Sequence, residues 1–275
     1  MLHISGYRST EKLYESHNSL VYRAVREGTT DEHSVIVKVL KPAYPSSEKV
    51  AWFKREYELT RDLGLEGVVK VYELRKEAQR WVMVLEDFAG ESLKRLSLAG
   101  QMGLADFLQL AIDISSILGQ IHARHVMHKD INPANIVFNP TNGEVKIIDF
   151  GISAQLPSAA FGKLPQQNSA FAHANLAGTA FELAGTLAYI SPEQTGRMNR
   201  TVDYRTDFYS LGATFYELLT GQLPFSSDDP LELVHFHIAK TPRLPHEVNP
   251  AIPPAVSSII MKLLAKTAQE RYQSA

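Results

Sequence analysis

The hydrophobic periodicity of the chain changes near Gly90, and this change constrains the fold more than any other feature of the sequence. Before it, short apolar runs rich in β-branched residues, such as Val35 to Leu40, indicate strands with one helix among them. After it, apolar residues recur at helical spacing over long segments. A strand-rich half joined to a helix-rich half predicts an α+β fold with two lobes and a cleft between them.

The predicted elements follow this division. In the first half we expect strands over most of residues 1–45, a helix from Ser46 or Ser47 to about Leu63, and strands at Val68–Leu74 and Trp81–Leu85. In the second half we expect a hairpin of Ile136–Phe138 and Val145–Ile148, and helices at about Ala105–His125, Asp207–Thr220, Asp229–Ile238 and Pro254–Thr267. Residues 152–184 are rich in Ala, Ser, Gly, Gln and Pro, which indicates a long functional or disordered loop.

Composition excludes several classes of site and partner. The net charge is -2, so no basic field favours nucleic acid or an anionic membrane as a partner. The absence of cysteine excludes disulfides, thiolate zinc sites and cysteine nucleophiles, and it fits a reducing, cytoplasmic compartment. Polar residues interrupt each apolar run, so we expect no membrane span and no secretion signal. The chain stops directly after a helical pattern without a breaker, and we expect its last helix to be truncated from a longer protein.

Oxygen-bearing side chains cluster at the two ends of the predicted hairpin. Asp130 and Asn135 lie in the loop that follows the long helix, and Asp149 ends the second strand of the hairpin. Hard cations such as Mg²⁺ prefer oxygen ligands and keep waters and substrate phosphates in their shell. One carboxylate and one amide would make such a site and leave Asp130 free to face a hydroxyl. Alone, each piece has an ordinary explanation as a turn or a cap, but their joint spacing favours a site.

The segments His128-Lys-Asp-Ile-Asn-Pro-Ala-Asn135 and Asp149-Phe-Gly151 resemble the catalytic loop and the metal-binding motif of eukaryotic-type protein kinases. The resemblance implies that Asp130 accepts the proton of the substrate hydroxyl, while Asn135 and Asp149 hold Mg²⁺. It implies a bilobal kinase fold. The small antiparallel-sheet lobe, with one main helix, and the hinge would span residues 1–88, and the mainly helical lobe residues 89–275. We expect His128 to support the catalytic loop by hydrogen bonds.

The same resemblance places Lys38 on the α- and β-phosphates of ATP and makes Glu56 its ion-pair partner. Two simpler explanations stay open. Lys38 could be an exposed strand lysine, and Glu56 could lie on a solvated helix face, which is the better interpretation of its sequence context alone. For Lys38 we favour burial, because Val-Ile-Val precedes it and Val-Leu follows it, and a lone buried charge needs a partner.

Further markers of the family lie along most of the chain. Ser191-Pro-Glu193 resembles its Ala-Pro-Glu segment, Asp207 the aspartate that braces the catalytic loop, and Arg271 the partner of Glu193. Leu85 stands at the gatekeeper position before the hinge, and Gly185-Thr186 with Tyr189 match the substrate-reading loop. The resemblance implies that nucleotide and metal are bound by Tyr14, Ser16, Ser19, Val21, Lys38, Glu56, Glu86, Phe88, Asn135 and Asp149.

Three departures from the family concern the nucleotide and the loop. Tyr14, Ser16 and Ser19 occupy the three positions where the family has phosphate-binding glycines, so we expect weaker or slower nucleotide handling. Lys129 replaces the arginine that pairs with a phosphorylated loop, so we expect activity without that phosphorylation. Asn132 replaces a lysine that steadies the γ-phosphate, and as a catalytic residue it would offer only an amide donor.

We therefore expect an ATP-dependent serine/threonine protein kinase with Mg²⁺ as cofactor and a Ser or Thr protein substrate. The alternative is a pseudokinase, a nucleotide-responsive or scaffolding module, which the altered phosphate loop favours and the intact set of Lys38, Glu56, Asp130, Asn135 and Asp149 opposes. A small-molecule phosphotransferase shares the Asp, Asn and Asp geometry but usually lacks the Ser-Pro-Glu segment.

Three strings, Ile148–Ser153, Leu187–Arg200 and Leu264–Ala275, give a closer resemblance. They are similar to kinase domains that open long cyanobacterial sensor proteins, in which ATPase-like, GAF and often histidine-kinase modules follow. The resemblance implies that further domains of the same polypeptide are partners of this domain.

Overall fold

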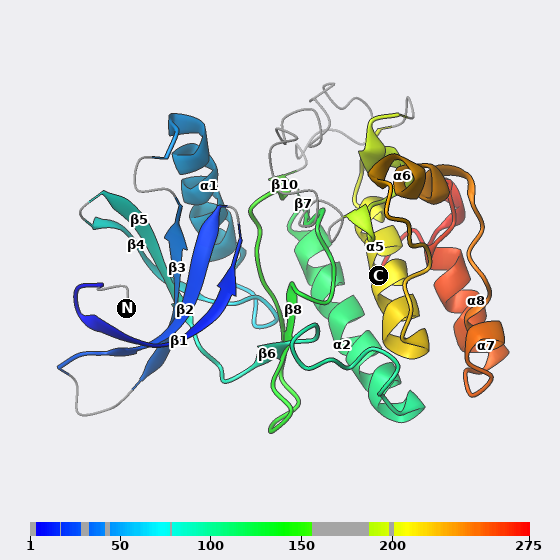
Figure 1. Ribbon diagram of the computed structural model, residues 1–275, viewed down its shortest axis with the longest axis horizontal. Coiled ribbons are helices and arrows are strands. Elements are labelled where there is room, and N and C mark those ends of the chain that lie inside the picture. The colour runs from blue at the N-terminus through cyan, green and yellow to red at the C-terminus, as the bar shows by residue number, and fades with distance from the viewer. Residues whose placement is uncertain are drawn as a thin grey trace.

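The computed structural model describes residues 4–16, 18–28, 33–41, 45–77, 79–155, 187–197 and 201–275, and it has two lobes (Figure 1). A five-stranded antiparallel sheet in the order β1-β2-β3-β5-β4 forms the N-terminal lobe. Its strands are β1 (Tyr7–Glu15), β2 (Ser19–Arg26), β3 (Ser34–Leu40), β4 (Val71–Glu77) and β5 (Arg80–Glu86). The second lobe is mainly helical, so the predicted α+β bilobal fold is confirmed. Gly185-Thr186 and most of the predicted loop 152–184 lie outside the described residues.

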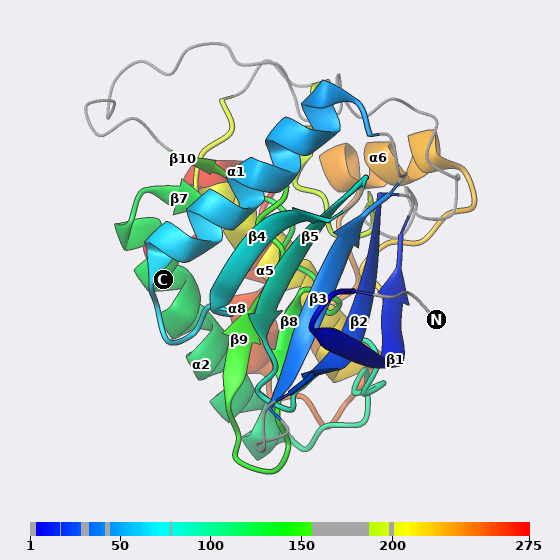
Figure 2. The same ribbon diagram turned by 90° about the vertical axis from the view of Figure 1, so that its left-hand side faces the viewer.

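Helix α1 (Ser47–Leu63) packs on one face of this sheet (Figure 2). The Ser46 side chain caps its first turn by accepting the Lys49 amide at 3.3 Å, and Gly64 ends it in the left-handed conformation with φ 55°. Phe53 of the helix packs with Leu40, Met83 and Leu85 of the sheet. Side chains alternate along a strand, so every second residue of β3 faces this helix.

The chain crosses to the second lobe at Asp87–Gly90. Two small sheets lie close to the junction of the lobes, one in the order β6-β8-β9 and one in which β10 pairs with β7 (Figure 1). The elements of the second lobe are β6 (Glu91–Ser92), α2 (Leu104–Ala123), β7 (Val126–Met127), β8 (Ile136–Phe138), β9 (Val145–Ile147), β10 (Ala154–Gln155), η1 (Pro192–Thr195), α5 (Arg205–Thr220), α6 (Pro230–Ala239), α7 (Pro245–Val248), α8 (Pro254–Leu263) and η2 (Ala268–Glu270).

Helix α5 lies at the centre of the second lobe and is buried along almost its whole length. Its Gly212 is needed for packing, because a Cβ atom there would lie 2.7 Å from Leu263 Cβ on α8. Phe215 of α5 meets Phe107 of α2 edge to face, with ring centroids 5.4 Å apart. A helix that is buried on all sides gives the lobe a fixed frame on which the loops above it are mounted.

Helix α2 corrects one expectation. By length and composition it could cross a membrane, although we expected no apolar segment of that kind. Its apolar side chains Phe107, Leu110, Ile114, Leu118 and Ile121 pack in the core of the second lobe, which accounts for its composition. The feature therefore has a sufficient explanation in the core.

A second attachment between the lobes lies far from the hinge in sequence. In the connection from α1 to β4, the Gly67 carbonyl accepts the Ile147 amide at 2.9 Å, and the Val69 amide donates to the Ile147 carbonyl at 3.4 Å. Gly67 also lies tightly against Ile117 of α2, where a Cβ atom would come within 2.2 Å of the side chain. The end of α1 is thus tied to β9 and α2 of the second lobe.

Two element boundaries differ from the prediction for identifiable reasons. Strand β4 begins at Val71 instead of Val68, because Val68 forms its bridge with Ile147 of the other lobe. Helix α8 ends at Leu263 instead of Thr267. Arg271 binds the carbonyl oxygens of Ala265 and Lys266 at 2.8 and 3.4 Å, which directs this backbone away from the helix axis.

Candidate active site

Strand alternation places Lys38 on the face of the sheet that α1 covers. Its neighbours Val37 and Val39 are buried on the opposite face. Lys38 Nζ lies 2.6 Å from Glu56 Oε1 on α1 and 3.2 Å from Asp149 Oδ1, which follows β9. One ammonium group therefore joins the sheet and helix of the first lobe to the second lobe.

Glu56 is buried, with 6% of its surface exposed, so the interpretation of a solvated helix face is wrong. It belongs to the buried stripe of α1, together with Phe53, Thr60 and Leu63. Spacings of three and four residues place these side chains on one face. This spacing of apolar residues around Glu56 therefore indicated its burial, although the polar character of the side chain did not.

The charges of Lys38 and Asp149 stabilise each other, whereas burial, with a further contribution from the charge of Asp149, outweighs Lys38 and raises the pKa of Glu56 to about 7. Burial disfavours the ammonium ion, but the carboxylates of Asp149 and Glu56 outweigh it and raise the pKa of Lys38. Burial likewise opposes ionisation of Asp149, yet Lys38 and the amide of Gly151 keep the pKa of Asp149 below its usual range. The site thus holds a lysine cation and an Asp149 anion at neutral pH.

Asp130 is held by two asparagine side chains of its own loop. Asn132 Nδ2 donates to Asp130 Oδ1 and Asn135 Nδ2 donates to Asp130 Oδ2, both at 2.9 Å. The same two amide groups bind the Asp130 carbonyl at 3.1 and 2.9 Å. Each carboxylate oxygen therefore has a fixed donor, and the orientation of Asp130 is determined within the loop.

The pKa of Asp130 suits a proton acceptor. Burial, and then the negative charge of Asp149, raise it to about 7, while the hydrogen bonds from Asn135 and Asn132 lower it. A base with a pKa near the working pH combines the correct protonation state with a useful driving force for proton transfer. Asn132, which stands where the family has a lysine, is here a group that orients the base.

The backbone of the loop is braced from α5. Asp207, fully buried, accepts the amides of His128 and Lys129 at 2.9 and 2.6 Å. His128 Nε2 binds the Ile148 carbonyl, so that nitrogen carries the proton, and Nδ1 accepts the Asp130 amide at 3.2 Å. Burial also lowers the pKa of His128. His128 is therefore a neutral structural group that links the loop to the strand before Asp149.

The residues suited to a divalent cation are Asn135 and Asp149. Asn135 uses Nδ2 to hold Asp130, and this orients its amide plane and leaves the oxygen for another partner. Asp149 is the more accessible member of its ion pair, with 43% of its side chain exposed against 12% for Lys38. One carboxylate and one amide oxygen match the donor set that Mg²⁺ accepts alongside waters and phosphates. The chain's own residues fit this cation.

The predicted phosphate-binding turn is closed by its own hydrogen bonds. We call Ser16 and Asn18, which lie between β1 and β2, together with Ser19, the first residue of β2, the serine turn. Ser16 Oγ accepts the amides of Asn18 and Ser19 at 3.2 and 3.0 Å, and the Ser16 amide donates to the Ser19 carbonyl at 2.9 Å. In the strand register Tyr14 lies opposite Val21, and Val21 lies opposite Lys38. Val21 therefore shares the sheet face of Lys38.

The two predicted hinge residues make structural contacts. Glu86 Oε2 accepts Lys146 Nζ at 2.7 Å and the Lys70 amide at 3.1 Å. The Phe88 carbonyl accepts Asn139 Nδ2 at 2.8 Å, and the Phe88 ring lies under Lys146 Nζ, 5.1 Å from its centroid. The Glu86 carboxylate is thus engaged with the protein, and adenine binding at this segment stays a prediction.

Ion pairs of differing exposure cross from the first lobe to the hinge and the segment after it. Arg95 Nη2 lies 2.8 Å from Glu11 Oε1 on β1, and Arg23 of β2 lies 2.8 Å from Asp87 and 3.2 Å from Glu91. The pair of Arg95 and Glu11 is exposed and contributes about 1 kcal/mol or less. The Asp87 side chain is buried, with 4% of its surface exposed, so its pair with Arg23 is the better shielded of these contacts.

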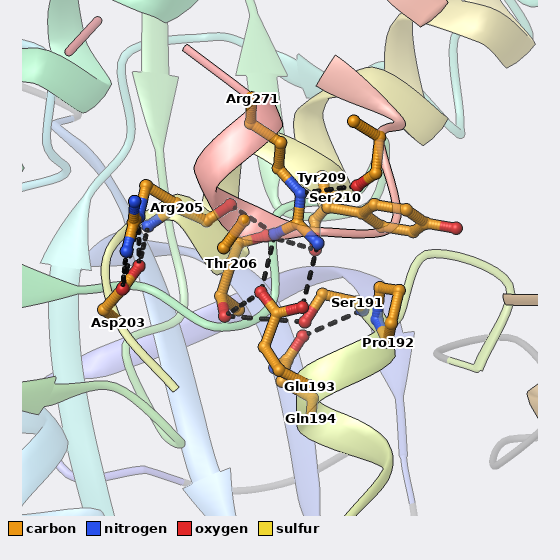
Figure 3. Close-up of polar contacts among 12 residues, drawn as sticks. Ser191, Pro192, Glu193, Gln194, Asp203, Arg205, Thr206, Tyr209, Ser210 and Arg271 are labelled. Carbon is orange, nitrogen blue, oxygen red and sulfur yellow. Dashed lines mark hydrogen bonds and ion pairs between the residues drawn. The ribbon is translucent and has the colours of Figure 1, made fainter. Parts of the chain in front are cut away.

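A buried ion pair anchors the segment after residue 187. Arg271 donates to both oxygens of Glu193 at 2.6 and 2.8 Å, and Thr206 Oγ1 donates to the same carboxylate at 2.8 Å (Figure 3). Arg271 Nη1 also donates to the Arg205 carbonyl at 2.9 Å. Burial opposes the charge of Glu193, but Arg271 keeps its pKa low. A two-pronged pair of this kind fixes η1 against α5 and the end of the chain.

Three contributors were not identified from the sequence. His122 Nε2 lies 2.8 Å from Asp207, Asn139 holds the Phe88 carbonyl, and Lys146 neutralises Glu86. Lys146 had a signal, because it is a lone charge in an apolar strand, as Lys38 is. His122 and Asn139 had none, since their partners lie 85 and 51 residues away.

Comparisons with known proteins agree with this geometry. A family model described as protein kinase domain matches residues 7–275. A probable serine/threonine-protein kinase of Clostridium acetobutylicum is 29% identical over 271 residues, which are 98% of this chain and 38% of that protein. The DNA damage-responsive serine/threonine-protein kinase RqkA of Deinococcus radiodurans is 33% identical over 272 residues, with the same shares of 98% and 38%. A hybrid signal transduction histidine kinase of Dictyostelium discoideum is 35% identical over 222 residues, which are 62% of this chain and 6% of that protein. The chain spans well under half the length of each relative.

Proposed function

Since the chain belongs to the protein kinase family, we propose that it is a serine/threonine protein kinase domain that transfers the γ-phosphoryl group of ATP to Ser or Thr hydroxyls of proteins. One observation carries the proposal. Lys38 of the first lobe binds Asp149 of the second at 3.2 Å, and Asn135, whose backbone carbonyl accepts the amide of Ile148 next to Asp149 at 3.0 Å, donates to Asp130 at 2.9 Å. This arrangement supports one site in which Asn135 and Asp149 would hold the cation, Lys38 the phosphates and Asp130 the proton.

Each residue has a role in the transfer. Lys38, held by Glu56, neutralises phosphate oxygens of the bound nucleotide, and Asp130 orients the acceptor hydroxyl. The hydroxyl oxygen forms a bond to the γ-phosphorus, the bond from that phosphorus to the β-γ bridging oxygen breaks, and ADP leaves. The hydroxyl proton passes to Asp130. Asn135 and Asp149 would hold Mg²⁺, which when bound neutralises charge on the phosphates.

The test is transfer of labelled γ-phosphate from Mg-ATP to a generic protein substrate. Wild type should transfer, and Asp130→Ala and Asp149→Ala should not. Transfer that persists in both variants would refute the assigned roles. Binding of ATP to the wild type should be measured in parallel, because it separates loss of chemistry from loss of nucleotide.

The serine turn favours one other function, a nucleotide-binding regulatory domain without transfer. Its amides of Asn18 and Ser19 are bound to Ser16 instead of facing a ligand. In that case the wild type would bind ATP with an affinity unaffected by Asp130→Ala and would label no substrate. The buried pair of Lys38 and Glu56 and the held base favour the active enzyme.

The domain would act inside a longer cytoplasmic signalling protein. The resemblance to kinase domains of cyanobacterial sensor proteins supports this, and so does the similarity to a hybrid histidine kinase. Further domains of the same polypeptide would then supply the activating signal. Expression of the full-length protein with and without its other domains, followed by the same transfer assay, measures that regulation.

A further inference from the structure

The backbone of Lys129 is strained and is held on both sides. Its φ is 69°, a left-handed conformation that a residue with a long side chain adopts only at a cost of about 1 kcal/mol. Its amide donates to Asp207 at 2.6 Å, and its carbonyl accepts Gln194 Nε2 at 2.9 Å. The next residue is Asp130, so the direction in which the base points depends on this peptide unit.

Gln194 is fixed as firmly as the backbone it holds. Its side-chain Oε1 accepts the Ser191 backbone amide at 3.1 Å (Figure 3), and its Nε2 donates to the Lys129 carbonyl at 2.9 Å. Because the oxygen can only accept and the NH2 group can only donate, these two contacts allow one orientation of the side-chain amide. The backbone amide of Gln194 also donates to the Ser191 carbonyl at 3.1 Å. Gln194 is buried, with 6% of its surface exposed.

The element that carries Gln194 is anchored independently of the catalytic loop. Glu193, its neighbour in η1, is bound by Arg271 and Thr206. The carbonyl of Tyr189, earlier in the same segment, accepts a hydrogen bond from Ser210 Oγ at 2.8 Å. The side chain of Gln194 therefore transmits the position of a rigid segment to the strained peptide before Asp130.

We propose that Gln194 is a positioning residue for Asp130, acting through the Lys129 carbonyl and coupling the segment 187–193 to the catalytic loop. This role rests on the proposed kinase function for its effect on rate. Its effect on the conformation of the loop does not depend on that function. Lys129 leaves the left-handed conformation when the contact is lost, and the carboxylate of Asp130 then turns from its place.

The experiment compares Gln194→Met, which keeps length and removes both hydrogen bonds, with Gln194→Glu, which keeps an acceptor for the Ser191 amide but has no donor for the Lys129 carbonyl. Both should lower kcat by about tenfold or more, because a small misplacement of a reacting group is costly. KM for ATP should change less than about twofold. Tyr204→Phe is the matched control, since it removes one hydrogen bond, to the Gln273 carbonyl at 2.8 Å, without touching Glu193, Gln194 or Lys129, and its kcat should stay near wild type.

A second variant tests the strain directly. In a Lys129→Gly background, where φ 69° is permitted without strain, Gln194→Met should lower kcat by less than about threefold. A full tenfold loss in that background, or an equal loss of kcat in Tyr204→Phe, would mean that Gln194 only stabilises the fold and would overturn the proposal.

Amide hydrogen exchange tests the positioning role of Gln194 even if the wild type transfers no phosphate. Gln194→Met should speed exchange over residues 128–132, while Tyr204→Phe should not. Unchanged exchange over this loop in Gln194→Met would refute the positioning role whatever the activity, whereas absent transfer with faster exchange would refute only the kinase function.

Discussion

In the catalytic loop, residues 128–135, the proposed base Asp130 is half-buried and the backbone is held from outside by Asp207 and Gln194. In the serine turn, by contrast, Ser16 holds the amides of Asn18 and Ser19 within the turn itself. Both regions belong to the same proposed reaction, one at the acceptor and one at the nucleotide. In the proposed reaction, contacts from outside the loop thus fix the residue that takes the proton, whereas hydrogen bonds within the turn close the segment expected at the phosphates.

The largest effect is expected from removing the negative charge of Asp149, next to the catalytic loop. Asp149→Asn keeps an oxygen that can accept from Lys38 and Gly151 but removes the charge, so kcat should fall by about 10³. Initial rates with saturating Mg-ATP and peptide measure it. Thermal unfolding of the variant close to wild type would show that the fold is retained. A loss of less than about tenfold would contradict a cation-binding role for Asp149.

The next effect concerns the ammonium group between the lobes. Lys38→Met should lower kcat by about 10² and destabilise the fold by about 3 kcal/mol, because it leaves Glu56 buried without its partner. Rates and urea unfolding measure the two effects. Glu56→Gln is the control, since a neutral amide oxygen can still accept from Lys38, and its losses should be smaller on both scales. Equal losses in the two variants would argue against a direct contact of Lys38 with phosphate.

The pH dependence tests the raised pKa of Asp130. Only the ionised carboxylate can accept a proton, so kcat/KM should rise with pH up to about 7 and fall about tenfold per unit well below it. Asn132→Ala removes a donor that lowers this pKa, so its acid limb should move to higher pH. An acid limb near pH 4 in the wild type is the ordinary range of a carboxyl group. It would show that the group that titrates is not Asp130 with its raised pKa.

The smallest effect is expected in the serine turn. Ser16→Gly frees the amides of Asn18 and Ser19 for the phosphates, and at about 1 kcal/mol for one net hydrogen bond KM for ATP should fall about fivefold. Ser16→Ala separates the loss of the hydroxyl from the flexibility of glycine. A rise in KM in both variants would show that the hydroxyl itself binds the nucleotide, and the comparison between the two regions would fail.

Much of the fold followed from local patterns. The run from Val35 to Leu40 predicted β3, and the helical spacing of apolar residues after Ala105 predicted α2, because both segments bury their own faces. The start of β4 could not be predicted in this way, since Val68 is as apolar as Val71 and only its bridge to Ile147 excludes it from the strand.

Site residues that belong to a sequence motif could be predicted, whereas residues that reach the site only through tertiary packing could not. Asp130, Asn135 and Asp149 stood out by spacing, and the structure brings Asn135 to Asp130 and Asp149 to Lys38. Gln194 could not be identified, because its partner lies 65 residues away and a glutamine in a short helix has no local signature. The spacing of Glu56 from Phe53 and Leu63 indicated its burial, but only the family resemblance supplied Lys38 as its partner.

The attachment of Gly67 and Val69 to Ile147 has a mechanical consequence. Together with the covalent crossing at 87–90, it gives the lobes two fixed points, and two points define an axis of rotation. Strands β4 and β5 lie beside that axis, whereas β1 and β2 lie at the opposite edge of the sheet. Rotation about that axis would displace Lys38 by an intermediate amount and the serine turn by the most. It would also separate Lys38 from Asp149 and break the exposed pair of Arg95 and Glu11, the latter at small cost. In the proposed reaction, the turn expected nearest the phosphates is thus the part with the greatest travel.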